Sequence, residues 1–433
     1  MAFNKSIAEE LRERLPSHID VNTFHSKGLR VLLSNFRIKP KINENKCFVI
    51  GKKILDTKDM DVKQQIRYLF EIQIIWNYIR VNLITDYEKE IPGICIEKNI
   101  EFQERMVGDM EQIRNAWHKE MKKINSVKEI NIDFTDMLYF PYQLLDSEDF
   151  PKYDIVTLDE QQDANTLQKE LALRYIKKSG RFVVVGDSRQ CIYGFQGSSL
   201  EVFKSLQSYP NTIVLPLDIT YRCGKNIVEE ARKVFNNGIV AAPNAIDGIV
   251  RKGEFDEAEN GDFILCRNNL PLATVFLYLL EMGKKATIKG KDYGDALVAL
   301  VDKIKHIEDL DAMCEKKISE LKERGLTDIQ AKNNPSYVAF LEKCTILKIL
   351  YKNWGDMKKL EDNIKEIYKD DTEGIVLSTI HKSKGLEADR VFLLNRSLIP
   401  SKYANTEEAL YNEKCLLFVA ITRARKELVY CNV

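Results

Sequence analysis

The chain has 433 residues, of which 44% are hydrophobic and 30% are charged, and its 65 basic residues are balanced by 65 acidic ones. This length predicts two to four domains, and the zero net charge excludes a global basic field for nucleic acid, so that any such surface has to be local. The nine cysteines form no CxxC pair, which argues against a disulfide framework or a zinc site and favours a cytosol-like compartment, and no stretch reaches the roughly 18 apolar residues of a membrane span.

Strands and helices are predicted to alternate through the first half of the chain. Residues 1–4 have the pattern of a strand end, and residues 6–15 that of a short amphipathic helix. Residues 34–130 are charged and mostly helical in pattern. The other elements expected here are a short strand and a helix within 20–33, strands at 154–159, 182–187 and 212–215, and helices at 164–179 and 224–236.

The second half has a long charged segment, residues 302–369, with the period of helices. The strands expected around it lie at 262–266, 374–380, 389–394 and 427–431, with a helix at 413–424. Apolar strands that alternate with amphipathic helices predict doubly wound parallel sheets. The fold class is therefore expected to be α/β, with two parallel-sheet sets that are each interrupted by a mainly helical insertion.

The segment YDIVTLDEQQD, residues 153–163, carries the first chemical signal. An apolar strand ends in two adjacent carboxylates, Asp159 and Glu160. A buried strand that delivers carboxylates at its C-terminal end is how nucleotide hydrolases hold Mg²⁺ and orient a water molecule. Alone, the pair equally fits a solvated strand end, so its meaning depends on the segments that follow.

The segment FVVVGDSRQCIYGFQGS, residues 182–198, is a second strand that ends in a polar turn. Gln190 lies in the turn, where it could sense a phosphate beside the first strand. Tyr193 and Phe195 flank a glycine and offer faces on which bases stack, a contact worth about 1–3 kcal/mol per base. A strand and loop with two core aromatics is the alternative.

Three later segments add polar groups at strand and helix ends. In LDITYRCGKN, Arg222 can pair bidentately with phosphate and Tyr221 can stack on adenine. In TIHKSKGLEADRV, Gly385 permits close backbone approach to a ligand and the lysines supply charge for a nucleic-acid backbone. In LFVAITRARK, Arg423 ends a core helix, where an arginine that reaches a γ-phosphate contributes about 10³–10⁵ in rate.

Together these strings resemble superfamily 1 DNA helicases of the UvrD/Rep type, over nearly the whole chain. AFNKSIAEEL, TFHSKG and DFTDMLYFP resemble most the F-box DNA helicase branch and its phage relatives. The resemblance implies two RecA-like domains with helical insertions. It divides the chain into domain 1A (1–30 and 131–214), insertion 1B (31–130), domain 2A (215–270 and 371–433) and insertion 2B (271–370).

The resemblance also implies roles for individual residues in an ATP- and Mg²⁺-dependent motor that moves 3′ to 5′ on single-stranded DNA. Asp159 would hold Mg²⁺ and Glu160 would activate water. Gln190, Arg222 and Arg423 would address the γ-phosphate, with Tyr221 on adenine and Gly385 and Glu387 near the nucleotide. The implied DNA track consists of Phe3, Asn4, Thr23, His25, Tyr193, Phe195 and His381. A loading or replication protein in the cytoplasm of a bacterium or of a phage-infected cell is the implied partner, and replication or repair the implied setting.

Two departures from the family pattern bear on activity. Gln196 stands where the family usually has arginine, and no GxxxxGK[ST] phosphate loop occurs in the chain. The chain is thus expected to begin after that loop, with a gap in the first sheet that exposes strand edges. A mis-called start or a split gene would make it most of a helicase; otherwise it is a regulatory protein that binds single-stranded DNA without hydrolysing ATP.

Overall fold

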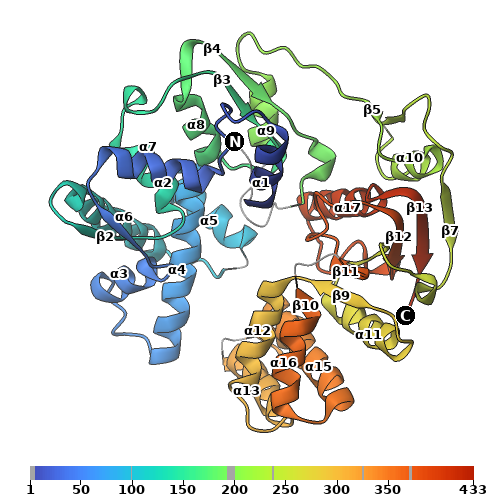
Figure 1. The fold of residues 1–433 in the computed structure, drawn as a ribbon. Coiled ribbons are helices and arrows are strands. Elements are labelled where there is room, and N and C mark those ends of the chain that lie inside the picture. The colour runs from blue at the N-terminus through green and yellow to red at the C-terminus, as the bar shows by residue number, and fades with distance from the viewer. Residues whose placement is uncertain (1–4, 99, 193–199, 237, 324–325, 370–372) are drawn as a thin grey trace. The chain divides into compact units, whose positions relative to one another are not determined.

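The computed structural model describes residues 5–98, 100–192, 200–236, 238–323, 326–369 and 373–433 (Figure 1). The chain divides into two compact units, residues 1–213 and residues 214–433. Each unit is described by itself. Among the described residues, no helix combines the length and the apolar character that crossing a membrane requires.

The described residues of unit 1 are mostly helical and include four strands. Its helices are α1 (Lys5–Arg14), α2 (Phe24–Asn35), α3 (Lys46–Ile54), α4 (Val62–Asn82), α5 (Tyr87–Glu97), α6 (Arg105–Lys122), α7 (Asp136–Leu144), α8 (Thr166–Arg174) and α9 (Leu200–Gln207). Its strands are β1 (Lys39–Ile42), β2 (Glu129–Ile132), β3 (Tyr153–Leu158) and β4 (Ile176–Val184).

The N-terminus of helix α2 and its packing against α7 each depend on one residue type in the sequence. Thr23 is its N-cap, and the Thr23 hydroxyl accepts the Ser26 amide at 3.2 Å. Gly28 lets α2 approach α7 closely, because a Cβ at this position would lie 2.3 Å from the Met137 carbonyl oxygen. The residue type at position 28 thus sets the spacing between these two helices.

A network of charged residues lies inside unit 1, among α3, α4, α6 and α7. Arg80 donates to both oxygens of Asp133, at 2.9 and 2.6 Å, and to Asp136 at 2.8 Å. Asp136 is fully buried and also accepts from Lys46 at 2.5 Å and from the Trp117 indole at 2.8 Å. Burial raises the pKa of Asp136, an effect that the nearby cations oppose. Two cations and two carboxylates thus balance in the core.

The sheets of unit 1 have two strands each within the described residues, β1 with β2 and β3 with β4, and both pairs are parallel. Some apolar side chains of the β3–β4 pair are exposed to solvent: Ile155 is 60% exposed and Val183 is 42% exposed. In the described part of the chain, β4 pairs with β3 along one edge, and no strand pairs with its other edge.

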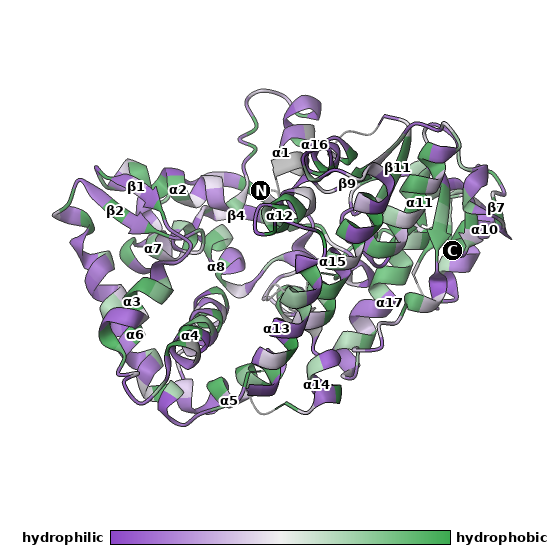
Figure 2. Cartoon of the chain, turned by 90° about the horizontal axis from the view of Figure 1, so that it is seen from below, coloured by the Kyte–Doolittle hydropathy of each residue, from purple (hydrophilic) through white to green (hydrophobic). Residues whose placement is uncertain are grey.

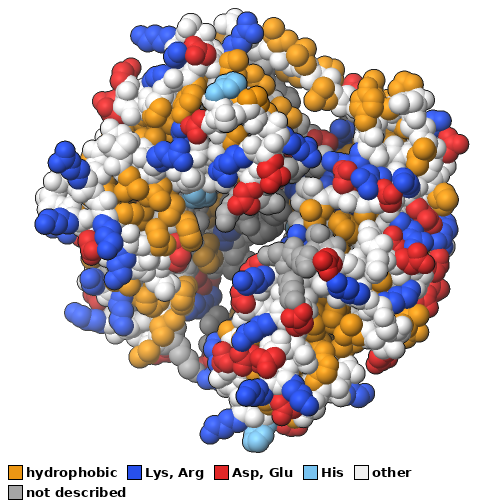
Figure 3. All heavy atoms as spheres, viewed as in Figure 1, with side chains coloured by type: hydrophobic (Ala, Val, Ile, Leu, Met, Phe, Trp, Pro, Cys, Tyr) orange, Lys and Arg blue, Asp and Glu red, His pale blue; other side chains and the backbone are white. Residues whose placement is uncertain are grey.

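The strand predicted at 212–215 does not form. Ile213 and Leu215 are 80% and 78% exposed, and Figure 3 shows hydrophobic side chains along this extended segment, which precedes β5 (Ile219–Thr220). A strand needs a neighbour that satisfies its backbone N–H and C=O groups. No described strand pairs with this segment, so an apolar, β-branched composition alone does not make it a strand.

Unit 2 is built on a parallel sheet of seven strands in the order β10-β9-β11-β8-β12-β13-β7. These strands are β7 (Ile249–Lys252), β8 (Phe263–Cys266), β9 (Ala286–Lys289), β10 (Tyr368–Lys369), β11 (Ile375–Thr379), β12 (Ala388–Leu394) and β13 (Ala424–Cys431). Every residue of β8 and β11 is buried, as in parallel sheets that helices cover on both faces. A separate pair joins β5 to β6 (Val240–Ala241).

The helices of unit 2 are α10 (Lys225–Arg232), α11 (Asn269–Glu281), α12 (Lys291–Val301), α13 (Asp309–Glu323), α14 (Asp328–Lys332), α15 (Pro335–Trp354), α16 (Met357–Ile367) and α17 (Glu407–Ile421). Figure 2 shows hydrophobic residues concentrated on the sheet strands and α11, whereas α13 carries both kinds. The structure confirms the predicted α/β class with parallel sheets. Strand β9 falls in the range predicted as insertion 2B, because its sequence, ATIK, is too short to give a strand pattern.

Candidate nucleotide and DNA site

The carboxylates of the DEQQD segment lie where two parallel strands of unit 1 end. Asp159 and Glu160 follow β3 directly and are half-buried. Glu160 has φ 52° and ψ 42°, a left-handed conformation that costs a non-glycine residue of order 1–3 kcal/mol and is found mostly at functional sites. The strained backbone turns the chain into the 3₁₀ turn Gln161–Asp163.

Gln162 joins the ends of the two strands, a role that the sequence does not reveal. Its side-chain nitrogen donates to a Glu160 carboxylate oxygen, and its side-chain oxygen accepts the Asp187 amide at 3.0 Å. Gln162 is fully buried, and Gly186 fits beside it because a Cβ there would lie 2.6 Å from the Gln162 side-chain oxygen. The amide thereby fixes the Glu160 carboxylate relative to the turn after β4.

Gln190 lies in that turn, the 3₁₀ helix Ser188–Gln190. Its side-chain nitrogen donates to Asp187 at 3.2 Å, and the Arg189 guanidinium pairs with the same carboxylate at 2.8 Å. The structure therefore places Gln190 in the turn after β4, the strand that pairs with β3, with Asp187 holding its amide.

The residues at this strand end match the donor set of a magnesium–phosphate ligand. Mg²⁺ is usually bound by one or two carboxylates together with waters and substrate phosphates. Within the described ranges no group of three or more His, Cys, Asp and Glu residues is placed to cage a metal. Gln161, which is 1% exposed, has both side-chain polar atoms without a hydrogen-bond partner in the described part of the chain. Asp159 and Glu160 thus fit a partly solvated cation.

The predicted DNA-contacting segment of α2 is fixed to β3. Lys27 donates to Asp20 and to the Tyr153 hydroxyl, and that hydroxyl donates to Asp20 at 2.6 Å. Hydrogen bonds from Lys27 and Tyr153 outweigh partial burial and lower the pKa of Asp20 to about 2. The position of His25 is thereby tied to the strand that carries the carboxylates.

His25 lies edge-on to Phe134, with ring centroids 6.4 Å apart. Phe134 is 52% exposed, so the pair presents an aromatic surface to solvent. Burial lowers the pKa of His25, which favours the uncharged ring. Phe134 is not among the residues predicted from the sequence to contact DNA, although an aromatic residue between two aspartates, as in DFTD, is unusual and is a signal for such a contact.

In unit 2, Arg222 and Glu387 come together although they lie far apart in the sequence. The Arg222 guanidinium pairs with the Glu387 carboxylate, and Arg425 lies 3.6 Å from the same carboxylate. Tyr221 is 80% exposed, so its ring is open for stacking. Gly385, in the loop that leads to Glu387, has φ +86°, which favours glycine.

Arg423 is buried, with an exposed fraction of 1%. Its guanidinium donates to the carbonyl oxygens of Val419 at 3.1 Å and of Leu386 at 3.0 Å. The proximity follows from the sheet, because Ala388 and Ala424 are paired at the start of the adjacent parallel strands β12 and β13. Arg423 and Glu387 therefore meet at the same sheet edge.

His381 follows β11 at the opposite edge of the sheet. Burial lowers the pKa of His381 to about 4, and the charge of Arg267 adds to this effect, whereas Glu413 opposes it. The imidazole is therefore neutral at physiological pH. Four predicted DNA contacts, Phe3, Asn4, Tyr193 and Phe195, lie outside the described residues, as does Gln196.

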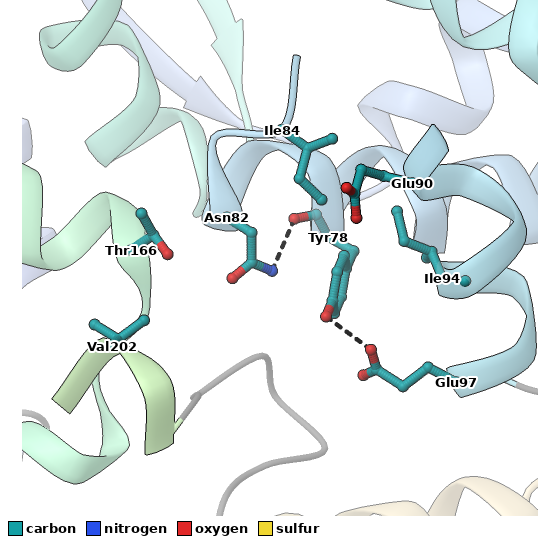
Figure 4. A pocket seen from close by; sticks show the side chains of 9 residues that line it. Tyr78, Asn82, Ile84, Glu90, Ile94, Glu97, Thr166 and Val202 are labelled. Carbon is teal, nitrogen blue, oxygen red and sulfur yellow. Dashed lines mark hydrogen bonds between the residues drawn. The ribbon is translucent and has the colours of Figure 1, made fainter. Parts of the chain in front are cut away.

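A pocket of about 270 Å³ opens in unit 1 between α4, α5, α8 and α9 (Figure 4). Tyr78 projects into it and donates to Glu97 at 2.7 Å, and Asn82 donates to the Tyr78 carbonyl oxygen at 3.1 Å. None of the residues predicted to contact nucleotide or DNA lines this pocket. It is therefore separate from the strand-end carboxylates.

Comparison with known proteins gives two family matches. The UvrD/REP helicase N-terminal domain matches residues 1–210, and the UvrD-like helicase C-terminal domain matches residues 111–432. The second match covers well over half of the chain. It contains the carboxylates after β3, Arg222, the HKSKGLE loop and Arg423.

Individual relatives are more distant. The chain is 27% identical to F-box DNA helicase protein 1 of Schizosaccharomyces pombe, over 69% of this chain and 37% of that protein. It is 21% identical to the ATP-dependent DNA helicase Rep of Buchnera aphidicola, over 100% of this chain and 87% of that protein. It is 27% identical to the ATP-dependent DNA helicase PcrA of Bacillus subtilis, over 55% of this chain and 33% of that protein. Two of these three matches thus span about a third of the relative's length.

Proposed function

The chain belongs to the UvrD-like helicase family, and from this premise we propose that it acts as an ATP-driven motor on single-stranded DNA. The observation that carries the proposal is the grouping of polar residues at the C-terminal ends of β3 and β4 in unit 1 and before the starts of β12 and β13 in unit 2. In unit 1, Gln162 holds Glu160 beside the turn of Gln190. In unit 2, Arg222, Glu387 and Arg423 lie at one sheet edge.

Bound Mg²⁺–ATP would supply the phosphoryl group whose hydrolysis drives movement. Of the residues in the chain, Asp159 offers a carboxylate to the cation, and Glu160 orients a water molecule and accepts its proton. Arg222 neutralises phosphate charge once its guanidinium leaves Glu387, and Tyr221 stacks on the base. These assignments are supported by the strand-end positions and by the family's roles for the matching residues.

The DNA surface that we propose in unit 1 combines Thr23, His25 and Phe134. The exposed edge of the His25–Phe134 pair suits a base, since base–aromatic stacking is sequence-tolerant. In unit 2, we propose that His381 also contacts DNA. Movement from 3′ to 5′ is proposed from the family relationship, and translocation assays on strands labelled at either end would test it.

One observation favours a second candidate function, a protein that binds single-stranded DNA without hydrolysing ATP. No GxxxxGK[ST] string occurs in the 433 residues. Backbone amides of that loop cradle phosphates in nucleotide hydrolases of this type, and its lysine neutralises them. Binding that is indifferent to ATP would therefore follow if no other element takes over this role.

ATP hydrolysis by the purified chain, with and without single-stranded DNA, separates the two candidates. The motor proposal expects turnover that DNA stimulates, that Glu160→Gln abolishes and that the exposed control Glu148→Gln keeps. Binding titrations at several salt concentrations complete the test, because log K falls with log salt by roughly 0.7 per phosphate contacted on a single strand. The second candidate is supported if the chain binds DNA in a salt-dependent way without ATP turnover and Glu160→Gln leaves this binding unchanged. Absence of DNA binding contradicts both candidate functions.

A further inference from the structure

We propose that Glu413 is a positioning residue that holds Arg267 and thereby presents His381 to single-stranded DNA. The inference deepens the proposed function and rests on the DNA-contacting role assigned there to His381. Nothing in the HKSKGLE loop itself shows which residues outside it fix the histidine, and the sequence separates Arg267, His381 and Glu413 widely.

The sheet explains why Arg267 and His381 are neighbours. Strands β8 and β11 are parallel and adjacent, with Cys266 paired to Thr379. Arg267 follows β8 and His381 follows β11 by two residues, so both emerge at the same edge of the sheet. The Ile380 amide donates to the Cys266 carbonyl oxygen at 3.0 Å, which extends this pairing to the base of the loop.

Glu413, on α17, pairs with Arg267 where β8 ends. Its carboxylate accepts Arg267 Nε at 2.9 Å and Nη2 at 2.5 Å, and it accepts the Ser401 amide at 2.9 Å. The Glu413 side chain is 11% exposed, so the pair is largely removed from water. A bidentate pair of this kind fixes orientation as well as charge.

The two charges act on His381 in opposite senses. Arg267 disfavours the imidazolium, and Glu413 favours it. With both in place, burial leaves a neutral ring that can donate one hydrogen bond and accept another. Loss of Glu413 would leave the Arg267 cation beside the ring without its partner and free to change rotamer.

The segment that follows α17 contacts the far end of the same loop. Arg423, ten residues after Glu413, lies about 15 Å along a helical path and donates to the Leu386 carbonyl oxygen. Every residue of α17 from Cys415 to Ile421 is buried. Helix α17 and the two residues that follow it thus connect the His381 end of the loop, through Glu413, with the Leu386 end, through Arg423, which provides a route by which DNA contact can influence the residues proposed to bind nucleotide.

A double-mutant cycle on the full chain tests the positioning role. Single-stranded DNA binding is measured by fluorescence anisotropy for Glu413→Gln, His381→Ala and the double variant, with Glu408→Gln, an exposed glutamate on α17, as the matched control. We expect Glu413→Gln to weaken binding about tenfold, and to have almost no further effect in the His381→Ala background. An equal loss in both backgrounds, or no loss, overturns the inference.

Histidine NMR gives a second readout that needs no DNA, and the chain has only five histidines. The His381 pKa should fall in Glu413→Gln and rise when Arg267→Gln is added, because the cation is then gone. An unfolded variant would instead titrate near 6.5 in both cases. An unmoved His381 pKa in both variants overturns the inference. If the wild-type chain does not bind DNA, the proposed function fails, while opposite pKa shifts still support Glu413 as the residue that positions His381.

Discussion

Asp136→Asn should destabilise unit 1 far more than the loss of a surface ion pair of similar length. The substitution keeps the shape of the side chain but removes one of two carboxylates that balance Arg80 and Lys46. All three side chains are at most 5% exposed, so water cannot compensate the remaining cation. The new amide nitrogen also faces donors, among them the Trp117 indole.

The expected cost is about 3–5 kcal/mol, the range for breaking a buried pair by removing one partner. With a urea m value of about 2–3 kcal/mol per molar, the unfolding midpoint falls by about 1–2 M. Adding Lys46→Gln removes the uncompensated cation. The double variant should therefore recover part of the loss, by about 0.5–3 kcal/mol.

The assay is urea unfolding followed by tryptophan fluorescence in a Trp354→Phe background. The chain has three tryptophans, and the two that remain, Trp76 and Trp117, lie in the core of unit 1 and are fully buried. The control is Asp154→Asn, which breaks a pair with Lys177 at 2.9 Å on the surface.

Equal midpoints for Asp136→Asn and Asp154→Asn would refute the reasoning, because burial would then not set the cost. A double variant no more stable than Asp136→Asn would refute the charge-balance part alone.

Two further outcomes follow from the described geometry. Gly28→Ala should destabilise unit 1 by about 1–3 kcal/mol, since the new Cβ would lie 2.3 Å from the Met137 carbonyl oxygen. Gly108→Ala should instead stabilise unit 1 by about 0.5–1 kcal/mol, because Gly108 lies in α6 with open space around it. Thermal unfolding of both variants checks the contrast, and a stability change of the same sign in both would contradict it. His381 has a folded-state pKa of about 4, below the unfolded value of about 6.5, so the unfolded state binds more protons in this window and stability falls as the pH is lowered through it. His381→Asn should reduce the loss of unfolding free energy on acidification, measured by urea unfolding at several pH values with the fluorotryptophan NMR signal of Trp354 as the probe. An unchanged dependence of the unfolding free energy on pH would count against the lowered pKa of His381.

Strands β8 and β11 were predicted within about a residue, because a fully buried, uninterrupted apolar run has few other folds open to it. Strand β12 was predicted equally well from its apolar second half, although Asp389 and Arg390 near its start are only partly buried. Strand β4 begins at Ile176, inside the range expected as helix. Its first half, IKKSGR, is charged and exposed, so it carries no strand pattern and depends on β3 for its conformation.

The sequence names candidate site residues, but it does not predict the contacts between them. Glu160 and Gln190 were named from their strand ends, since position after a parallel strand is a local property. The amide bridge of Gln162 and the pairing of Arg267 with Glu413 join residues that only the folded chain brings together. Such partners leave no spacing signal in a single sequence.

The one-sided pairing of β4 bears on how the protein has to be handled. Among the described residues, its second edge offers unpaired backbone groups beside exposed Val183 and Val185, and such edges recruit strands from other copies. Concentrated samples should therefore lose monomer to slow intermolecular sheet growth, faster with warming and with time in storage. A lysine in place of Val183 would shield that edge by charge repulsion and lengthen the useful life of a preparation.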